Sequence, residues 1–219
     1  MTTAKRGKAA RTRAALLVAL QQCLLESDEA AVSVSQLVAR AGVAQGTFYN
    51  YFDSLPAAVD AVGELLLAEH FRTVLKVIAG AVDAAEVVAR SDLQSLMLFA
   101  RRPDVGRLIF ESGQPVDRLI FFKAARKHLM ANLQWGVDTG AFSAGDLEVA
   151  CSIHIGGMIG ASLDVHRGRL SLDAGPEVVA RLLRDLGVSK RRAIRLAGAQ
   201  QEFEPWRPLP LVPHEEEDK

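Results

Sequence analysis

The chain has 219 residues, of which 49% are hydrophobic and 24% are charged, so it can bury a sizeable core and has the composition of an ordinary globular protein. Its formal net charge is zero, which excludes a uniformly basic nucleic-acid-binding protein and leaves only local charge as a route to DNA. Cys23 and Cys151 lie far apart within apolar helical patterns, and we expect small buried side chains rather than a disulfide.

The N-terminal residues are basic and lead into a helix. The first thirteen residues contain five Lys and Arg residues, including Arg11 and Arg13, and no acidic residue. We therefore expect residues 1–9 to form a flexible basic arm that can reach DNA phosphates. A helix is predicted from about residue 10 to residue 26, with an apolar face that includes Leu16, Leu17 and Leu20.

Residues 33–52 predict two short helices joined by a tight turn. Ser33 and Gln36 fit a capping box at the start of the first helix. Gly42 stands where a helix ends in a left-handed residue. The second helix, predicted over residues 45–51, would bury Phe48 and expose polar and aromatic side chains suited to phosphates and base edges.

This stretch resembles the helix-turn-helix of the TetR family of bacterial transcriptional regulators. The similarity is carried by Leu-Val-Ala-Arg-Ala-Gly-Val-Ala-Gln-Gly-Thr-Phe-Tyr-Asn-Tyr-Phe, residues 37–52. It implies that the helix beginning at Gln45 enters the major groove, with Gln45 and Thr47 facing base edges. The resemblance, together with the basic arm, assigns DNA binding to Ser35, Gln45, Gly46, Thr47, Tyr49, Asn50, Tyr51, Arg11 and Arg13.

Two positions depart from the family pattern. Leu55 stands where family members often carry a Lys that meets a phosphate, so that contact is lost or left to backbone amides. Ala44 replaces the usual Ser cap, which can cost the recognition helix up to about 1 kcal/mol. Both departures shift phosphate binding towards Arg11, Arg13 and the arm.

The rest of the chain is also predicted to be helical, because no run alternates apolar and polar residues as a strand would. Ser54 caps a long helix that has Pro56 in its first turn and ends near residue 79. Further helices are predicted near residues 81–90, 91–101, 104–111, 115–138, 146–166, 176–186 and 189–200.

The expected fold is all-α, with an N-terminal three-helix helix-turn-helix domain followed by a helical ligand-binding and dimerisation domain. The predicted boundaries are residues 10–54 for the DNA-binding domain and residues 55–202 for the helical body. Residues 203–219, rich in proline and acidic at the end, are predicted to be an extended or disordered tail.

The helical body is expected to hold an effector pocket, since aromatic residues there are interspersed with a few polar ones. The same pattern fits an ordinary core, and Asn132 or His154, if buried, needs a partner from a neighbouring helix or from a ligand. The candidate pocket residues are Phe99, Phe110, Phe122, His128, Asn132, Trp135, His154 and Met158.

A dimer interface is expected where small residues let another helix approach closely. The resemblance implies a bundle of four helices formed by two copies of residues 146–166 and 176–186. The alternative is that the small residues accommodate a neighbour in the same chain. The candidate interface residues are Gly156, Gly157, Gly160, Val179, Leu182 and Leu183.

No catalytic signature, phosphate-binding glycine loop or metal-ligand spacing of histidines is visible, so we expect neither an enzyme nor a metal or other cofactor. We also expect a cytoplasmic location, without a signal peptide or membrane span. The resulting hypothesis is a homodimeric repressor that a small apolar effector releases from a double-stranded DNA operator. The alternatives are an all-helical enzyme acting on an apolar substrate and a non-specific architectural DNA-binding protein.

Overall fold

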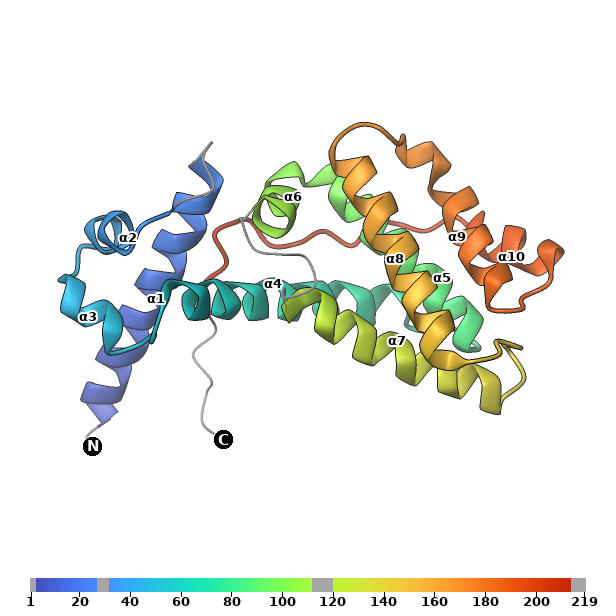
Figure 1. The fold of residues 1–219 in the computed structure, drawn as a ribbon, viewed down its shortest axis with the longest axis horizontal. Coiled ribbons are helices and arrows are strands. Elements are labelled where there is room, and N and C mark those ends of the chain that lie inside the picture. The colour runs from blue at the N-terminus through green and yellow to red at the C-terminus, as the bar shows by residue number, and fades with distance from the viewer. Residues whose placement is uncertain (1–2, 27–31, 112–119, 214–219) are drawn as a thin grey trace. The chain divides into compact units, whose positions relative to one another are not determined.

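The computed structural model describes residues 3–26, 32–111 and 120–213, with side chains from residue 7 onward in the first range and from residue 123 onward in the last. Within these ranges all regular structure is helical (Figure 1). Two compact units are formed, the first from residues 1–69, 107–121 and 207–219 and the second from residues 70–106 and 122–206. No helix in the described part of the chain is both long and apolar enough to span a membrane.

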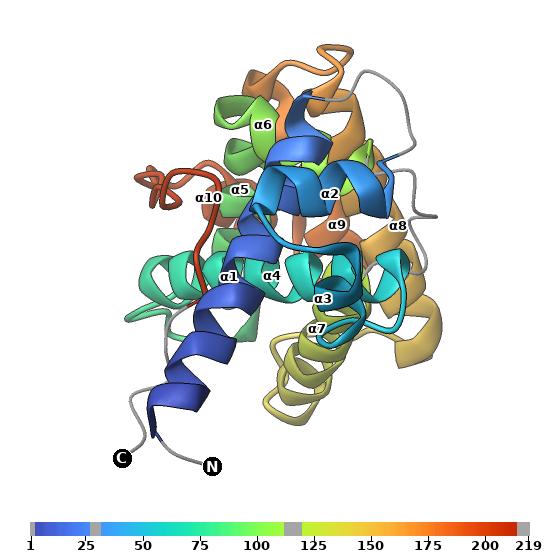
Figure 2. The same ribbon diagram turned by 90° about the vertical axis from the view of Figure 1, so that its left-hand side faces the viewer.

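The first unit contains the helix-turn-helix together with the helices that precede and follow it in sequence (Figure 2). Its core is formed by leucines of the first helix packed with Leu37 and Phe48, both fully buried. The helices are α1 (Thr3–Glu26), α2 (Val34–Ala41), α3 (Gln45–Tyr49) and the first part of α4 (Leu55–Val77).

The start of α1 differs from the sequence-based prediction. The helix begins at Thr3, so most of the segment predicted as a flexible arm over residues 1–9 is helical. The physical reason lies in its composition, because Ala, Lys and Arg all favour helix and only Gly7 opposes it. Lys8 of this segment is therefore exposed on a helix rather than on a free arm.

The second unit is organised around α5, which packs against α8, α9 and α10. The remaining part of α4 also belongs to this unit, and α6 has residues in both units. The helices are α5 (Ala84–Arg101), α6 (Pro103–Phe110), α7 (Ile120–Asp138), α8 (Leu147–His166), α9 (Gly175–Asp185) and α10 (Lys190–Ala197), with a 3₁₀ turn at Leu172–Ala174.

One continuous helix, α5, replaces the two helices predicted over residues 81–90 and 91–101. Asp83 caps it by accepting a hydrogen bond from the Glu86 amide. Ser91 and Ser95 sit inside the helix because their hydroxyls donate to the carbonyls four residues earlier, at 2.8 Å and 2.9 Å. Their polar groups are thus satisfied without breaking the helix.

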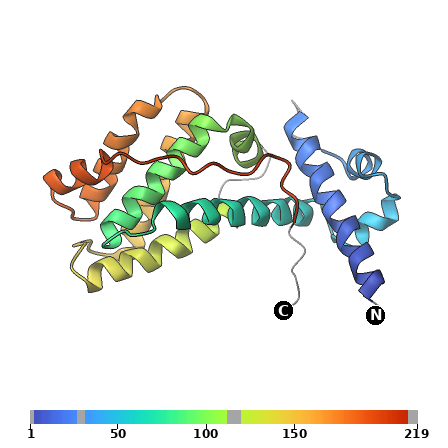
Figure 3. The ribbon, with the colours of Figure 1, turned by 180° about the vertical axis from the view of Figure 1, so that it is seen from behind.

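The segment after α10 has no regular structure, as predicted, and the structure describes it as far as residue 213. In Figure 3 its first part is the red trace that crosses α5 (green). Gln94 of α5 fixes it through the backbone of Glu204, donating to its carbonyl at 2.7 Å and accepting from its amide at 3.2 Å. Trp206 and Leu211 are buried, each 4% exposed. Of the two predicted alternatives, an extended tail or a disordered one, the described part of the tail shows the first, because side-chain amides satisfy its backbone.

Candidate nucleic-acid interface

The turn between α2 and α3 has the geometry that the sequence predicted. The Ser33 hydroxyl accepts a hydrogen bond from the Gln36 amide at 3.2 Å, and the Gln36 side chain accepts one from the Ser33 amide at 2.9 Å. Gly42 then adopts φ 67°, a left-handed conformation that reverses the chain. The Val43 amide closes the turn by donating to the Val38 carbonyl at 3.0 Å. The turn thus fixes the direction in which α3 begins.

The recognition helix α3 is held by its aromatic residues. Phe48 is fully buried, and its ring lies 5.6 Å from that of Phe52 and 5.2 Å from that of Tyr49. No side chain caps the start of α3 at Ala44, as the sequence indicated. The α-helix ends at Tyr49 rather than at Tyr51, since the Asn50 amide bonds the Thr47 carbonyl and tightens the last turn.

The side chains predicted to bind DNA lie on the outside of this helix-turn-helix. Tyr49 is 53% exposed, although it adjoins the buried Phe48. A side chain at Gly46 would meet no atom within 4 Å, so nothing in the described chain limits an approach to this point. Gln45, Gly46, Asn50 and Ser35 are exposed, and Thr47 and Tyr51 are partly exposed.

The two arginines of α1 differ in their surroundings. Arg11 is exposed, whereas the Arg13 guanidinium lies 5.4 Å from the centre of the Phe52 ring. This cation–π contact places a positive charge beside the helix-turn-helix. Leu55 begins α4 and Ser54 caps it, with the Ala57 amide donating to the Ser54 hydroxyl at 3.3 Å. The structure thus places an apolar residue at the position where the family often has Lys.

The residues predicted to line an effector pocket differ in their burial and surroundings. Phe99 and Met158 are buried in the second unit, whereas Trp135 is 40% exposed and Asn132 is partly exposed. His128 is exposed, and its ring lies 4.1 Å from that of Phe71. Of the two further candidates, Phe110 belongs to the first unit, and the Phe122 side chain lies outside the described residues.

His154 is the predicted pocket residue with the most distinctive environment. It is 2% exposed, and its Nε2 lies 2.9 Å from the carboxylate of Asp92 on α5. A neighbouring helix thus supplies the partner, one of the two sources that the sequence left open. Its Nδ1 is buried without a hydrogen-bond partner among the described residues. Asp92 was missed by the sequence analysis, although an Asp in the middle of an apolar helix pattern was a usable signal.

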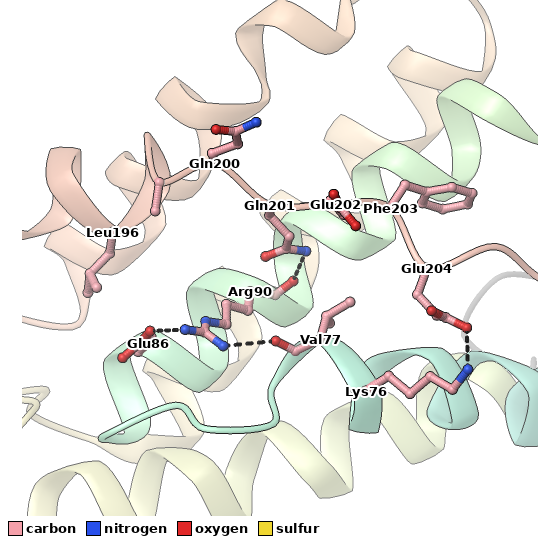
Figure 4. A pocket seen from close by; sticks show the side chains of 11 residues that line it. Lys76, Val77, Glu86, Arg90, Leu196, Gln200, Gln201, Glu202, Phe203 and Glu204 are labelled. Atoms are coloured by element: carbon pink, nitrogen blue, oxygen red, sulfur yellow. Dashed lines mark hydrogen bonds and ion pairs between the residues drawn. The ribbon is translucent and has the colours of Figure 1, made fainter.

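A pocket of about 360 Å³ lies elsewhere in the second unit, and none of the predicted effector residues lines it (Figure 4). Four of its charged side chains form two ion pairs. The Lys76 ammonium lies 2.7 Å from Glu204, and Arg90 pairs with Glu86. The hydrogen bonds from Lys76 and Arg72 lower the pKa of Glu204. The walls are formed by Lys76, Val77, Glu86, Arg90, Leu196, Ala199, Gln200, Gln201, Glu202, Phe203 and Glu204.

The predicted dimer-interface residues separate into two groups. Gly156, Gly157 and Gly160 are exposed along α8, and Leu182 is partly exposed. A Cβ at Gly157 would lie 2.8 Å from the Leu182 side chain, so this glycine allows a close approach within the same chain. Val179 and Leu183 are fully buried in their own unit, and their assignment to an interface is wrong because α9 turns them towards the core.

Comparisons with known proteins agree with this geometry. Residues 16–54 match the sequence model described as "Bacterial regulatory proteins, tetR family". No curated protein matches the chain.

Several solved structures share the fold. RolR in complex with resorcinol is 22% identical, with a TM-score of 0.69 over 95% of this chain and 100% of its own. A gamma-butyrolactone receptor described as ArpA-like is 21% identical, with a TM-score of 0.58 over 87% of this chain and 96% of its own. The fatty acid degradation regulator FadR from Bacillus halodurans is 20% identical, with a TM-score of 0.60 over 81% and 97%. At these identities the structural matches show a common fold.

The family match falls on the helix-turn-helix, whose caps, turn and exposed helix have been described, and the shared fold extends over the helical body. Residues 16–54 therefore form a helix-turn-helix domain of the type found in tetR-family bacterial regulatory proteins, and the chain as a whole shares its fold with solved transcriptional regulators that include RolR.

Proposed function

We propose that the chain is a homodimeric repressor that leaves its operator when a small organic effector binds to the second unit. The observation that carries the DNA-binding part is the exposed face of α3, which presents Gln45, Tyr49 and Asn50 from a helix anchored by the buried Phe48. Amide and hydroxyl groups of this kind can read base edges and bind phosphates.

The outer face of α8 supports the dimer. Val149 and Ile153 are 55% and 50% exposed, unusually high for large apolar side chains on one helix. One and two turns further along the same face are Gly156 and Gly160, which are also exposed and add no bulk. A second copy of this helix could therefore approach closely and cover the apolar side chains. Two-fold symmetry would place two recognition helices on half-sites about 34 Å apart.

The pair of His154 and Asp92 supports an effector site in the second unit. The unpartnered Nδ1 of His154 is a buried polar atom that a ligand oxygen could satisfy. Structural neighbours with this fold include RolR bound to resorcinol and a gamma-butyrolactone receptor, whose ligands are small molecules bearing oxygen atoms. We expect an effector of this size and chemistry to bind better to a conformation that disfavours the operator, so each ligand lowers the affinity of the other.

Selection of random double-stranded DNA with the full-length protein tests the proposal. The expected result is a two-fold symmetric consensus whose half-sites are about one helical turn apart. A panel of small phenols and lactones is then screened for compounds that raise the melting temperature and weaken binding to the selected duplex. Enrichment of DNA without any consensus would contradict the proposal and favour a non-specific architectural protein.

A further inference from the structure

The last residues that the structure describes belong to the DNA-binding unit. Residues 207–211, here called the strap, have no regular structure, bend at residues 209–210, and lie within the first unit although they follow the whole helical body in sequence. Pro208 is exposed, whereas Leu211 is 4% exposed, so the end of the strap is buried in this unit. Pro208 and Pro210 lack amide hydrogens and restrict the backbone, which lowers the entropy lost on ordering an extended segment.

The first anchor of the strap is a glutamine in the buried face of α1. Gln21 is 0% exposed, and its amide nitrogen donates to the Leu211 carbonyl at 2.8 Å. The Leu211 amide donates back to the Gln21 oxygen at 2.8 Å. A glutamine in an otherwise apolar core is costly unless its groups are paired. The polar residue in the core of α1 thus has a specific role, which is to bind a peptide unit of the strap.

The second anchor is a carboxylate on α4. Glu69 is 0% exposed and accepts hydrogen bonds from the Arg207 backbone amide at 2.6 Å and from its Nε at 2.8 Å. Charge-assisted bonds of this kind are about twice as strong as neutral ones. Because a buried carboxylate requires such pairing, Glu69 depends on Arg207 for part of its solvation. The strap therefore joins α1 and α4 within the DNA-binding unit.

We infer that the strap positions α1 for DNA binding, without contacting DNA itself. The helix that carries Gln21 also carries Arg11 and Arg13, and Arg13 lies over Phe52 beside the recognition helix. Fixing the later turns of α1 to α4 would fix the direction in which its basic first half points. The inference rests on the DNA-binding role given above, and it assigns Gln21, Glu69 and Arg207 as positioning residues for phosphate contacts.

The test uses the full-length chain and the duplex selected by the unchanged protein. Gln21→Leu places an apolar side chain of similar size on α1 and removes both hydrogen bonds to Leu211. We expect faster amide hydrogen exchange at Leu211 and operator binding weakened by about tenfold, with a shallower dependence on salt because phosphate contacts are lost. In an Arg11→Ala, Arg13→Ala background the same substitution should have little further effect on operator affinity.

Two further variants complete the test. Val212→Ala is the matched control, since Val212 adjoins the strap but is 60% exposed, and its operator affinity should not change. Arg207→Lys keeps a positive charge near Glu69 but loses the paired geometry. It is the milder second variant should Gln21→Leu fail to fold, and it should weaken binding by about threefold with the same change in salt dependence.

Two results would overturn the inference. The first is an unchanged operator affinity and salt slope when exchange at Leu211 has become fast. The second is an equal loss of affinity with and without Arg11 and Arg13, which would show general destabilisation rather than positioning. If the unchanged chain selects no DNA sequence, the proposed function fails first, before any strap variant is compared.

Discussion

The imidazole of His154 on α8 lies 2.9 Å from the carboxylate of Asp92 on α5, with both side chains buried. Burial by itself would lower the pKa of His154, but attraction to Asp92, their hydrogen bond and the charge of Asp185 together outweigh it and raise this pKa above its usual value near 6.5. The charged form is thus favoured in the folded protein more than in the unfolded chain. Its contribution to stability is present below about pH 6.5 and is lost as the pH rises through the raised pKa.

The substitution Asp92→Asn should reverse this pH dependence. Without the carboxylate, burial dominates and the pKa of His154 falls below its usual value. The loss in unfolding free energy caused by the substitution should therefore be larger near pH 6 than near pH 8.5. Urea unfolding of both proteins at the two pH values measures this loss, and NMR titration of His154 checks the change in its pKa directly. Equal losses at both pH values would show that the pair contributes through packing alone.

Protonation of His70 should destabilise the folded protein, whereas protonation of His154 should stabilise it. Complete burial lowers the pKa of His70 to about 4, and its Nε2 lies 3.3 Å from the Ser95 hydroxyl. The neutral form is favoured on folding, so its contribution is present above about pH 6.5 and is lost as the pH falls towards 4. His70→Gln cannot titrate and should reduce the loss of unfolding free energy between about pH 7 and pH 5 by on the order of 2 kcal/mol. Parallel curves for the two proteins would contradict the burial argument.

The local signals of the helix-turn-helix could be predicted from the sequence because each depends on neighbouring residues. A capping box needs only Ser33 and Gln36, and a left-handed helix end needs only a residue such as Gly42. Phe48 was correctly placed in the core because it interrupts a run of polar residues at helical spacing. The type of domain thus followed from about twenty residues.

Pairings between distant residues could not be predicted in the same way. Asp92 and His154 are 62 positions apart, and Gln21 and Leu211 are 190 apart, so no local pattern connects them. Val179 was assigned to an interface from its helical face, but one sequence cannot tell a face that packs on its own chain from one that packs on a partner. Such long-range pairs, and the partner of each helix face, are known only once the folded structure shows which helices pack together.

Tyr49→Ala should weaken operator binding and leave the fold intact. The ring is 53% exposed and makes an edge-on contact with the buried Phe48, so the unfolding free energy should change by less than about 1 kcal/mol. Operator affinity should fall by about tenfold in a gel-shift titration. Tyr49→Phe separates the hydroxyl from the ring, and unchanged affinity for Tyr49→Ala would remove this residue from the interface.

Phe48→Ala is the informative contrast to that substitution. Phe48 is 0% exposed, and truncating a buried Phe costs about 3–5 kcal/mol, which should unfold much of the first unit. Thermal unfolding followed by circular dichroism should show the loss before any DNA is added. If Phe48→Ala were stable and bound DNA normally, Phe48 would not anchor α3 to the core of the first unit, and the described orientation of this helix would be contradicted.

Ile153→Glu should convert the protein to a monomer. Ile153 is 50% exposed near the middle of α8, and a second copy covering it would have to bury the new carboxylate without a partner. Ile194→Glu is the matched control, because Ile194 is 53% exposed on α10, outside the proposed interface. Light scattering after gel filtration should give half the mass for Ile153→Glu only.

The Ile153→Glu monomer should also bind the full operator far more weakly than the control, since two linked recognition helices gain affinity that neither has alone. A dimer that survives Ile153→Glu would move the interface away from α8 and with it the predicted spacing of the half-sites.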